Sequence, residues 1–148
     1  MPNGGARTLA ELLHHAEESI ERLPPAGAHA AIGDGALLVD LRSDAARRRD
    51  GIVPGSLHIP RTVLEWRVAP DSEWRNPWIG GPEQRLVLIC DHGCSSVLAA
   101  ATLVELGFRR SGDVIGGFAA WRAAGLPVAE APEANPALLP GMGSPDDE

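Results

Sequence analysis

The sequence predicts an α/β domain with a central, mostly parallel β-sheet flanked by helices, and with a helical extension at its N-terminal side. Short apolar runs bounded by turn residues alternate along the chain with segments of helical periodicity. The 148 residues are enough for one domain with a proper core. Hydrophobic residues make up 44% and charged residues 22%, which is the composition of an ordinary globular domain.

The first predicted element is a helix over residues 8–23, where apolar residues recur at helical spacing. Thr8 is suited to cap this helix, because Glu11 follows three residues later and can complete a capping box. A Pro-Pro pair ends it. We therefore predict that residues 1–25 form a helical extension, which packs on the domain through its leucine face.

Residues 26–128 are predicted to form the domain itself, with strands that alternate with helices. In chain order, the sequence predicts a helix over 26–32, a strand over 36–41, a helix over 43–49, a strand over 56–59, a helical segment over 62–68, a strand over 85–90, a helix over 95–106, a strand over 113–115 and a helix over 118–124. From residue 129 onward the chain offers little to bury, so residues 129–148 are expected to be a flexible tail.

Composition and charge argue against several classes of function. The net charge of -7 comes without a basic patch, so we expect no nucleic-acid partner. Two cysteines close together in sequence cannot form the framework of a secreted disulfide scaffold, and the histidines are not arranged to complete a metal site. No segment has the length and apolarity of a membrane span or a signal peptide. We expect a cytoplasmic protein without metal, cofactor or membrane partner.

A short loop after the strand over 85–90 carries the candidate chemistry. The strand ends at Cys90, and the residues up to Ser96 lead directly into a helix. Such a loop curls its backbone N–H groups around the first side chain, and Gly93 can supply the positive φ that the curl needs. This cradle should favour the Cys90 thiolate, with a further hydrogen bond from the Ser96 hydroxyl. The alternative is a buried cysteine that acts only as a small hydrophobic residue.

At this point the chain resembles the rhodanese-like domain family, over about residues 36–128. The resemblance rests on segments in the family's order: "VDLR" (39–42), "GIVPGSLHIP" (51–60), "CDHGCSS" (90–96), which matches the active loop Cys-x-x-Gly-x-x-Ser, and "VIGGFAAW" (114–121). The segment "RTVLEWR" (61–67), with the N-terminal helix, looks like a single-domain bacterial subgroup.

The resemblance implies a sulfurtransferase in which Cys90 is the catalytic residue. Its thiolate would take the outer sulfur of a donor such as thiosulfate, and a thiol or protein acceptor would remove that sulfur from the Cys90 persulfide. One alternative is a non-catalytic module of the family that binds a protein or senses redox state. Another is a Cys-dependent phosphatase or arsenate reductase, which is disfavoured because Ser96 stands where a Cys-x5-Arg loop has its arginine. The oligomeric state stays open.

The remaining loop residues are expected to bind the substrate; they are Asp91, His92, Gly93, Cys94, Ser95 and Ser96. The loop lacks the Arg or Lys that many active members carry, and Ile52 stands where the family usually has His. Arg61 and Arg67 follow a neighbouring strand and could supply the missing positive charge; the alternative for Arg67 is a surface ion pair with Glu65 or Asp71.

Three further residues have predicted roles near the loop. Asp40 and Arg42 are expected to support it by pairing at the end of a strand. Cys94 could be a resolving thiol that forms a disulfide with Cys90 and expels hydrosulfide. We favour the alternative, in which Cys94 is a small residue at the mouth of the site, because side chains in such a curl tend to point outward.

Overall fold

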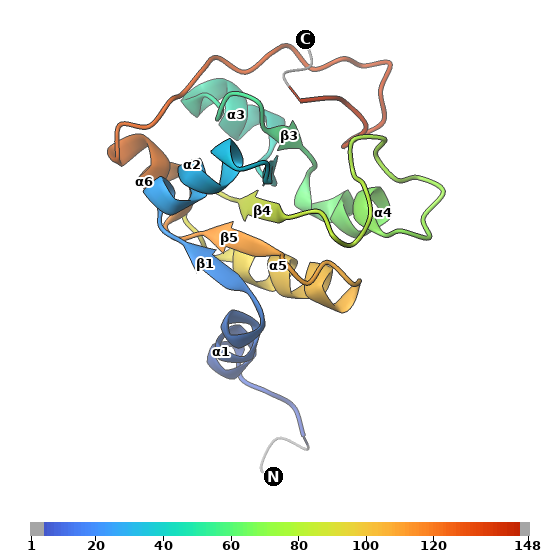
Figure 1. Cartoon of the computed structure of the whole chain (residues 1–148). Coiled ribbons are helices and arrows are strands. Elements are labelled where there is room, and N and C mark those ends of the chain that lie inside the picture. The colour runs from blue at the N-terminus through green and yellow to red at the C-terminus, as the bar shows by residue number, and fades with distance from the viewer. Residues whose placement is uncertain (1–4, 146–148) are drawn as a thin grey trace.

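The computed structural model describes residues 5–145 (Figure 1). Residues 1–4 belong to the segment in which the sequence predicts no signal peptide, and residues 146–148 belong to the predicted tail; both lie outside the described residues. The described part confirms the predicted fold class, because a central parallel sheet is covered by helices on both of its faces.

The sheet has five strands in the order β1-β5-β4-β2-β3, and every neighbouring pair is parallel. The strands are β1 (Glu21–Leu23), β2 (Leu37–Asp40), β3 (Leu57–His58), β4 (Leu86–Ile89) and β5 (Gly112–Val114). The central strand β4 is buried along its whole length, as expected of a strand covered on both faces. Because all strands run in one direction, their carboxyl ends meet at one edge of the sheet, where Cys90 follows β4.

Two apolar clusters cover the two faces of this sheet. Side chains of β4 alternate between them, since Leu88 belongs to the first cluster and Val87 to the second. The helices are α1 (Leu9–Ser19), α2 (Pro25–Gly33), α3 (Asp44–Asp50), α4 (Leu64–Val68), α5 (Ser95–Glu105) and α6 (Gly117–Ala123), with a short 3₁₀ helix, η1 (Arg61–Val63), before α4. The first cluster includes residues of α4 and α5, and the second includes residues of α2 and α6.

The predicted C-terminal boundary of the N-terminal helix is wrong. The capping box of Thr8 and Glu11 is present, but α1 ends at Ser19, and the next residues form the edge strand β1. Backbone hydrogen bonds to β5 decide this outcome: Glu21 donates to Ser111, and Ile115 donates to the carbonyl of Leu23. Helical periodicity continues through these residues, but pairing with a buried strand outweighs it.

The predicted packing of this helix through its leucines is wrong for Leu9 and Leu12. The buried residue of α1 is Ala16, whereas Leu9 is 66% exposed and Leu12 is 42% exposed. The small Ala16 side chain allows α1 to lie close against α5. Residues 1–25 therefore contribute both a helix and a strand that is hydrogen-bonded into the sheet.

The segment after residue 128 makes specific contacts. Ala129 forms an antiparallel bridge with Ile52, and the segment then crosses over α3 and returns towards α4 (Figure 1). Asn76 donates from its side-chain amide to the carbonyls of Gly141 and Gly143, at 2.8 Å each. Although the sequence predicts little for this segment to bury, Gly141 is buried.

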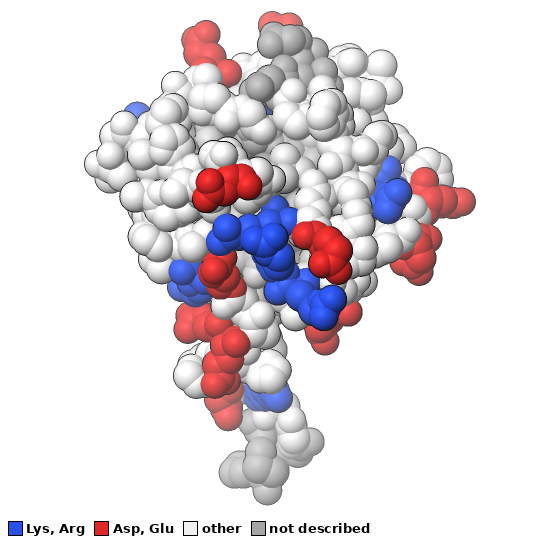
Figure 2. All heavy atoms as spheres, in the orientation of Figure 1, with Lys and Arg blue, Asp and Glu red and all other residues white. Residues whose placement is uncertain are grey.

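Charged side chains of both signs share the described surface (Figure 2). On the face seen in Figure 2, one group of basic side chains is bordered by acidic ones, without an extended surface of positive charge. Among residues 5–145, no helix is long and apolar enough to cross a membrane. No group of three or more His, Cys, Asp and Glu side chains in the same residues could hold a metal ion.

Candidate active site

Cys90 lies at the carboxyl end of the most deeply buried strand. Its side chain is buried, whereas Asp91, His92, Cys94 and Ser95 are exposed in the loop that follows. α5 begins at Ser95, so the loop between the two elements is as short as the sequence predicts. The sulfur therefore sits below a short exposed rim, at the edge of the sheet where parallel α/β proteins bind ligands.

The Cys90 sulfur accepts one backbone hydrogen bond, as the cradle hypothesis expects, and donates a second one to Ser96. The backbone N–H of Gly93 donates to Sγ at 3.2 Å, and the Ser96 hydroxyl oxygen lies 3.3 Å from Sγ. Burial acts to raise the pKa of the Cys90 thiol. The opposing effects of the Ser96 side chain and backbone, the Ser95 hydroxyl and the Gly93 N–H are larger in sum, and they hold that pKa below its ordinary value.

The start of α6 holds this loop from outside. The backbone N–H of Phe118 donates to the carbonyl of Cys90 at 2.8 Å, and that of Ala119 donates to the carbonyl of Asp91 at 3.1 Å. This approach needs glycine on both sides. Gly93 has a φ of +81°, and a Cβ there would lie 2.6 Å from the nitrogen of Gly116. Gly117 has a φ of +63°, and a Cβ there would collide with the carbonyl oxygen of Cys90.

A charged network lies behind the sulfur. Ser96 donates to Asp113 at 2.7 Å, and both residues are fully buried. Arg22 of β1 holds the Asp113 carboxylate with two hydrogen bonds, of 2.8 Å and 3.0 Å, and donates a third, of 3.1 Å, to the carbonyl of Gly93. A series of hydrogen bonds thus runs from Cys90 through Ser96 and Asp113 to Arg22. From Arg22 it leads back to the Cys90 loop at Gly93.

The model of the rhodanese-like domain family matches residues 25–124. The chain belongs to this family. Two curated relatives are named thiosulfate sulfurtransferase GlpE. The one from Pseudomonas savastanoi is 36% identical over 70% of this chain and 88% of its own length. The one from Stutzerimonas stutzeri is 36% identical over 69% of this chain and 84% of its own length.

Two solved structures share the rhodanese-like fold of this chain. A Rhodopseudomonas palustris protein of unknown function, named "possible tyrosine phosphatase", superimposes with a TM-score of 0.76 at 34% identity, over 86% of this chain and 98% of its own. The polysulfide-sulfur transferase homodimer of Wolinella succinogenes superimposes with a TM-score of 0.64 at 23% identity, over 86% and 90% of the two chains. The predicted family and fold are confirmed.

In this rhodanese-like domain, Asp40 and Arg42 occupy the predicted strand end beside the loop. Arg42 donates to the Asp40 carboxylate from Nε at 3.1 Å and from a terminal nitrogen at 2.8 Å, and the same terminal nitrogen donates to the carbonyl of Gly51. The Arg42 guanidinium also lies over the ring of Phe118, 3.8 Å from its centroid. The pair therefore connects the end of β2 to α6, the helix that holds the Cys90 loop.

Arg61 and Arg67 contact other parts of the protein, whereas the sequence predicts that they supply positive charge to the substrate. Arg61 pairs with Glu65 at 3.0 Å, while Arg67 is buried and donates to the carbonyls of Pro140 and Trp74. Both follow β3, and β2 separates β3 from β4 in the sheet. On the other side of β4, Arg22 reaches the loop instead.

Sequence reasoning missed Arg22 and Asp113 for different reasons. Arg22 was hidden because its segment has the periodicity of a helix, although it forms β1. Asp113 did carry a signal, since a carboxylate in a short, buried strand requires a buried partner. The identity of that partner could not be read from the sequence, because Arg22 lies 91 residues away along the chain.

The two cysteines have different environments in the rhodanese-like domain. Cys90 is buried and Cys94 is exposed, and both are free thiols. Cys94 precedes the first residue of α5, on the exposed rim of the loop. Its position at the rim agrees with the favoured hypothesis of a small residue at the mouth, and its redox role stays a prediction.

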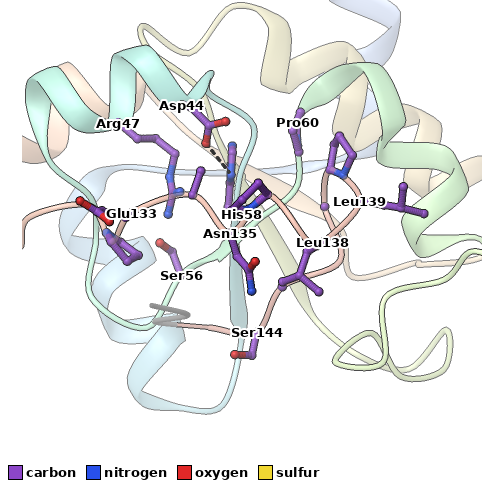
Figure 3. A pocket seen from close by; sticks show the side chains of 16 residues that line it. Asp44, Arg47, Ser56, His58, Pro60, Glu133, Asn135, Leu138, Leu139 and Ser144 are labelled. Atoms are coloured by element: carbon purple, nitrogen blue, oxygen red, sulfur yellow. Dashed lines mark ion pairs between the residues drawn. The ribbon is translucent and has the colours of Figure 1, made fainter.

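A separate cavity of about 270 Å³ lies on the other side of β2, between α3, β3 and the C-terminal segment (Figure 3). Asp44 and Arg47 of α3 and His58 of β3 line it, together with Glu133 and Asn135 of the C-terminal segment. No residue of the loop over 90–96 contributes to its lining. The cavity is therefore distinct from the candidate active site.

Proposed function

We propose that this chain is a sulfurtransferase that moves sulfane sulfur from a donor such as thiosulfate to a thiophilic acceptor, through a persulfide on Cys90. The observation that carries the proposal is the Cys90 sulfur itself, which accepts a hydrogen bond from the Gly93 N–H and donates one to the Ser96 hydroxyl oxygen. The relatives named thiosulfate sulfurtransferase GlpE support the same reaction class.

The first half of the reaction loads sulfur onto the protein. The Cys90 thiolate attacks the outer sulfur of thiosulfate, and a new bond between the two sulfur atoms forms. The bond from the outer sulfur to the sulfonate breaks, and sulfite leaves with the electron pair. The terminal sulfur of the persulfide carries the negative charge, which the Gly93 N–H and the start of α5 are placed to stabilise.

The second half returns Cys90 to its free state. An acceptor thiolate attacks the terminal sulfur, and the sulfur–sulfur bond to Cys90 breaks with its electron pair on the Cys90 sulfur. The substrate-binding role of the loop over 91–96 follows from this step, because the acceptor must enter past the exposed rim. The free thiols of Cys90 and Cys94 suit a reducing compartment, and we place the reaction in the cytoplasm.

Phosphoryl transfer is the reaction that the name of the Rhodopseudomonas palustris protein suggests. Phosphatases with a Cys-x5-Arg loop need a free guanidinium that binds two phosphate oxygens. Ser96 occupies that position here and points at Cys90 and Asp113. Arg22, which contacts the loop at Gly93, already uses its guanidinium on Asp113 and Gly93. These contacts favour sulfur transfer.

Mass spectrometry of the protein after incubation with thiosulfate tests the proposal. We expect the peptide that contains Cys90 to gain one sulfur atom, and cyanide to remove it as thiocyanate. Cys94→Ser serves as the matched control and should load equally. A sulfur gain on Cys94 alone, or no gain from either thiosulfate or a persulfide donor, would contradict the proposal. Hydrolysis of p-nitrophenyl phosphate that depends on Cys90 would favour the phosphatase instead.

A further inference from the structure

The hydrogen bonds behind Cys90 have a direction. A serine hydroxyl has a single hydrogen, and the Ser96 oxygen is shared between two neighbours, Asp113 Oδ2 at 2.7 Å and Cys90 Sγ at 3.3 Å. The carboxylate can only accept while it is ionised, and two hydrogen bonds from Arg22 favour the ionised form. The Ser96 hydrogen therefore goes to Asp113, and only a lone pair is left for Cys90.

We propose that Asp113 is a positioning residue that turns the Ser96 hydroxyl away from Cys90, so that the resting Cys90 donates its own hydrogen to Ser96 and keeps its proton to a higher pH than the cradle alone would allow. In this arrangement Arg22 balances the Asp113 charge and limits the effect. The proposal deepens the proposed function, since its consequence for turnover rests on Cys90 as the nucleophile.

Burial strengthens the preference of the Ser96 hydrogen for the Asp113 carboxylate. Asp113 and Ser96 are both fully buried, so water is a poor competitor for the Ser96 hydrogen. The geometry alone would allow Ser96 to donate to a Cys90 thiolate, and the contribution of this hydroxyl to the lowered pKa of Cys90 requires that orientation. Asp113 opposes it. Removal of the Asp113 charge should free the Ser96 hydrogen for the sulfur.

The other charged and titratable groups around Cys90 make contacts of a different kind. Asp91 and His92 are exposed on the loop itself, and Arg49 of α3 interacts electrostatically with Asp91. Arg42 is committed to Asp40, Gly51 and Phe118, while Glu17 of α1 contacts Arg22 from the outer side at 3.7 Å. The Arg22–Asp113 pair contacts both Ser96 and the loop.

The proton on the resting Cys90 thiol moves in both halves of the proposed reaction. When a donor reacts, Cys90 first releases its proton to solvent. When an acceptor thiol takes the sulfur, that thiol gives up one proton, the sulfur–sulfur bond breaks with its electron pair on Cys90, and the proton returns to Cys90. The Ser96 lone pair stabilises the thiol that results. The raised pKa makes Cys90 a slower leaving group in the second half of the reaction, because a thiol of lower pKa leaves faster as a thiolate.

The rate of Cys90 alkylation by iodoacetamide as a function of pH tests the proposal, in a Cys94→Ser background so that a single thiol reports. We expect Asp113→Asn to lower the apparent pKa of alkylation by about one pH unit, which below that pKa is an increase in rate of up to about tenfold. Arg22→Gln leaves the Asp113 charge unbalanced and should raise the same pKa. Glu17→Gln is the matched control, because it removes a carboxylate that contacts Arg22 but not Ser96, and it should leave the pKa unchanged.

The variant Ser96→Ala separates the effect of the Ser96 hydroxyl on the Cys90 pKa from the effect of the Asp113 charge. In that background, Asp113→Asn should produce less than half of its shift, since no hydroxyl hydrogen remains to be freed. An unchanged or raised pKa in Asp113→Asn would overturn the proposal. If that variant does not fold, Arg22→Gln is compared with and without Ser96→Ala, because Arg22 also acts directly on the Cys90 charge; an unshifted pKa, or a shift that Ser96→Ala leaves unchanged, overturns the proposal. Alkylation needs no sulfur transfer, so a protein that shows these shifts but takes up no sulfur would contradict only the proposed function.

Discussion

Arg42 and Phe118 form a contact that joins the end of β2 to the helix behind the active loop. The guanidinium carbon lies 3.8 Å from the centroid of the Phe118 ring, while two other bonds hold the same side chain on the Asp40 carboxylate. Phe118 in turn donates from its backbone to the carbonyl of Cys90. The shape of the loop thus depends on a pair that never contacts the sulfur.

Replacement of Arg42 by Met should therefore lower both stability and activity. It leaves the buried Asp40 with Arg47 as its remaining cation, and removal of one partner from a buried ion pair typically costs about 3–5 kcal/mol. Urea denaturation measures the loss. Arg49→Met is the matched control, because the exposed pair of Arg49 with Asp50 should contribute below about 1 kcal/mol. Equal losses in the two variants would contradict this account.

The two cysteines should respond differently to substitution. Cys90→Ser removes the proposed nucleophile, and we expect thiosulfate:cyanide activity to fall to background while the thermal midpoint changes little. Cys94→Ser changes an exposed side chain and should leave sulfur loading of Cys90 nearly intact. Peptide mapping after mild oxidation checks the remaining hypothesis. An abundant Cys90–Cys94 disulfide that a mild reductant reverses would make Cys94 a resolving thiol.

The exposed carboxylate of Asp91 should weaken the use of a dianionic donor. Two unit charges some 6 Å apart interact by roughly 3 kcal/mol at an effective dielectric constant of about 20, and exposure to solvent and salt reduces this. We expect Asp91→Arg to raise kcat/KM for thiosulfate several-fold at low salt, and Asp91→Asn to raise it less. The gain should shrink in high salt. Equal rates for all three proteins at low salt would show that Asp91 does not act on the donor.

The sequence was sufficient to predict features that local physics decides. Apolar runs identified β2 and β4, and the position of Cys90 at the end of a buried strand identified the active loop, because strand direction alone determines which edge carries it. The cradle followed from a short loop with glycine at Gly93. These features needed no knowledge of distant residues.

The features that failed all depend on contacts between distant segments. β1 forms only because β5 offers a free edge, and Arg22 reaches Asp113 only once β1 exists. Arg61 and Arg67 follow β3, and β2 lies between β3 and β4, so the strand order determines how close they come to the loop; their role toward the substrate stays a prediction. Strand order is a property of the whole sheet, and a single sequence gives it no local signal.

His58 should make the stability of the protein depend on pH. Burial, followed by the positive charge of Arg47, lowers the pKa of its imidazole below the ordinary value of 6.5, against the hydrogen bond to the Arg42 carbonyl. The folded protein therefore keeps His58 neutral at a pH where the unfolded chain binds a proton. The full contribution to stability is present above pH 6.5, and it is lost as the pH falls below this value.

Urea denaturation between pH 7 and pH 5 measures this dependence. Since one proton is involved, His58 can contribute a slope of at most about 1.4 kcal/mol per pH unit. We expect His58→Gln, which cannot titrate but can still donate to the Arg42 carbonyl, to reduce the loss of stability on acidification. His14→Gln on the exposed face of α1 is the matched control. If His58→Gln loses stability on acidification as steeply as His14→Gln and the unsubstituted protein do, burial of a neutral His58 does not determine the acid sensitivity.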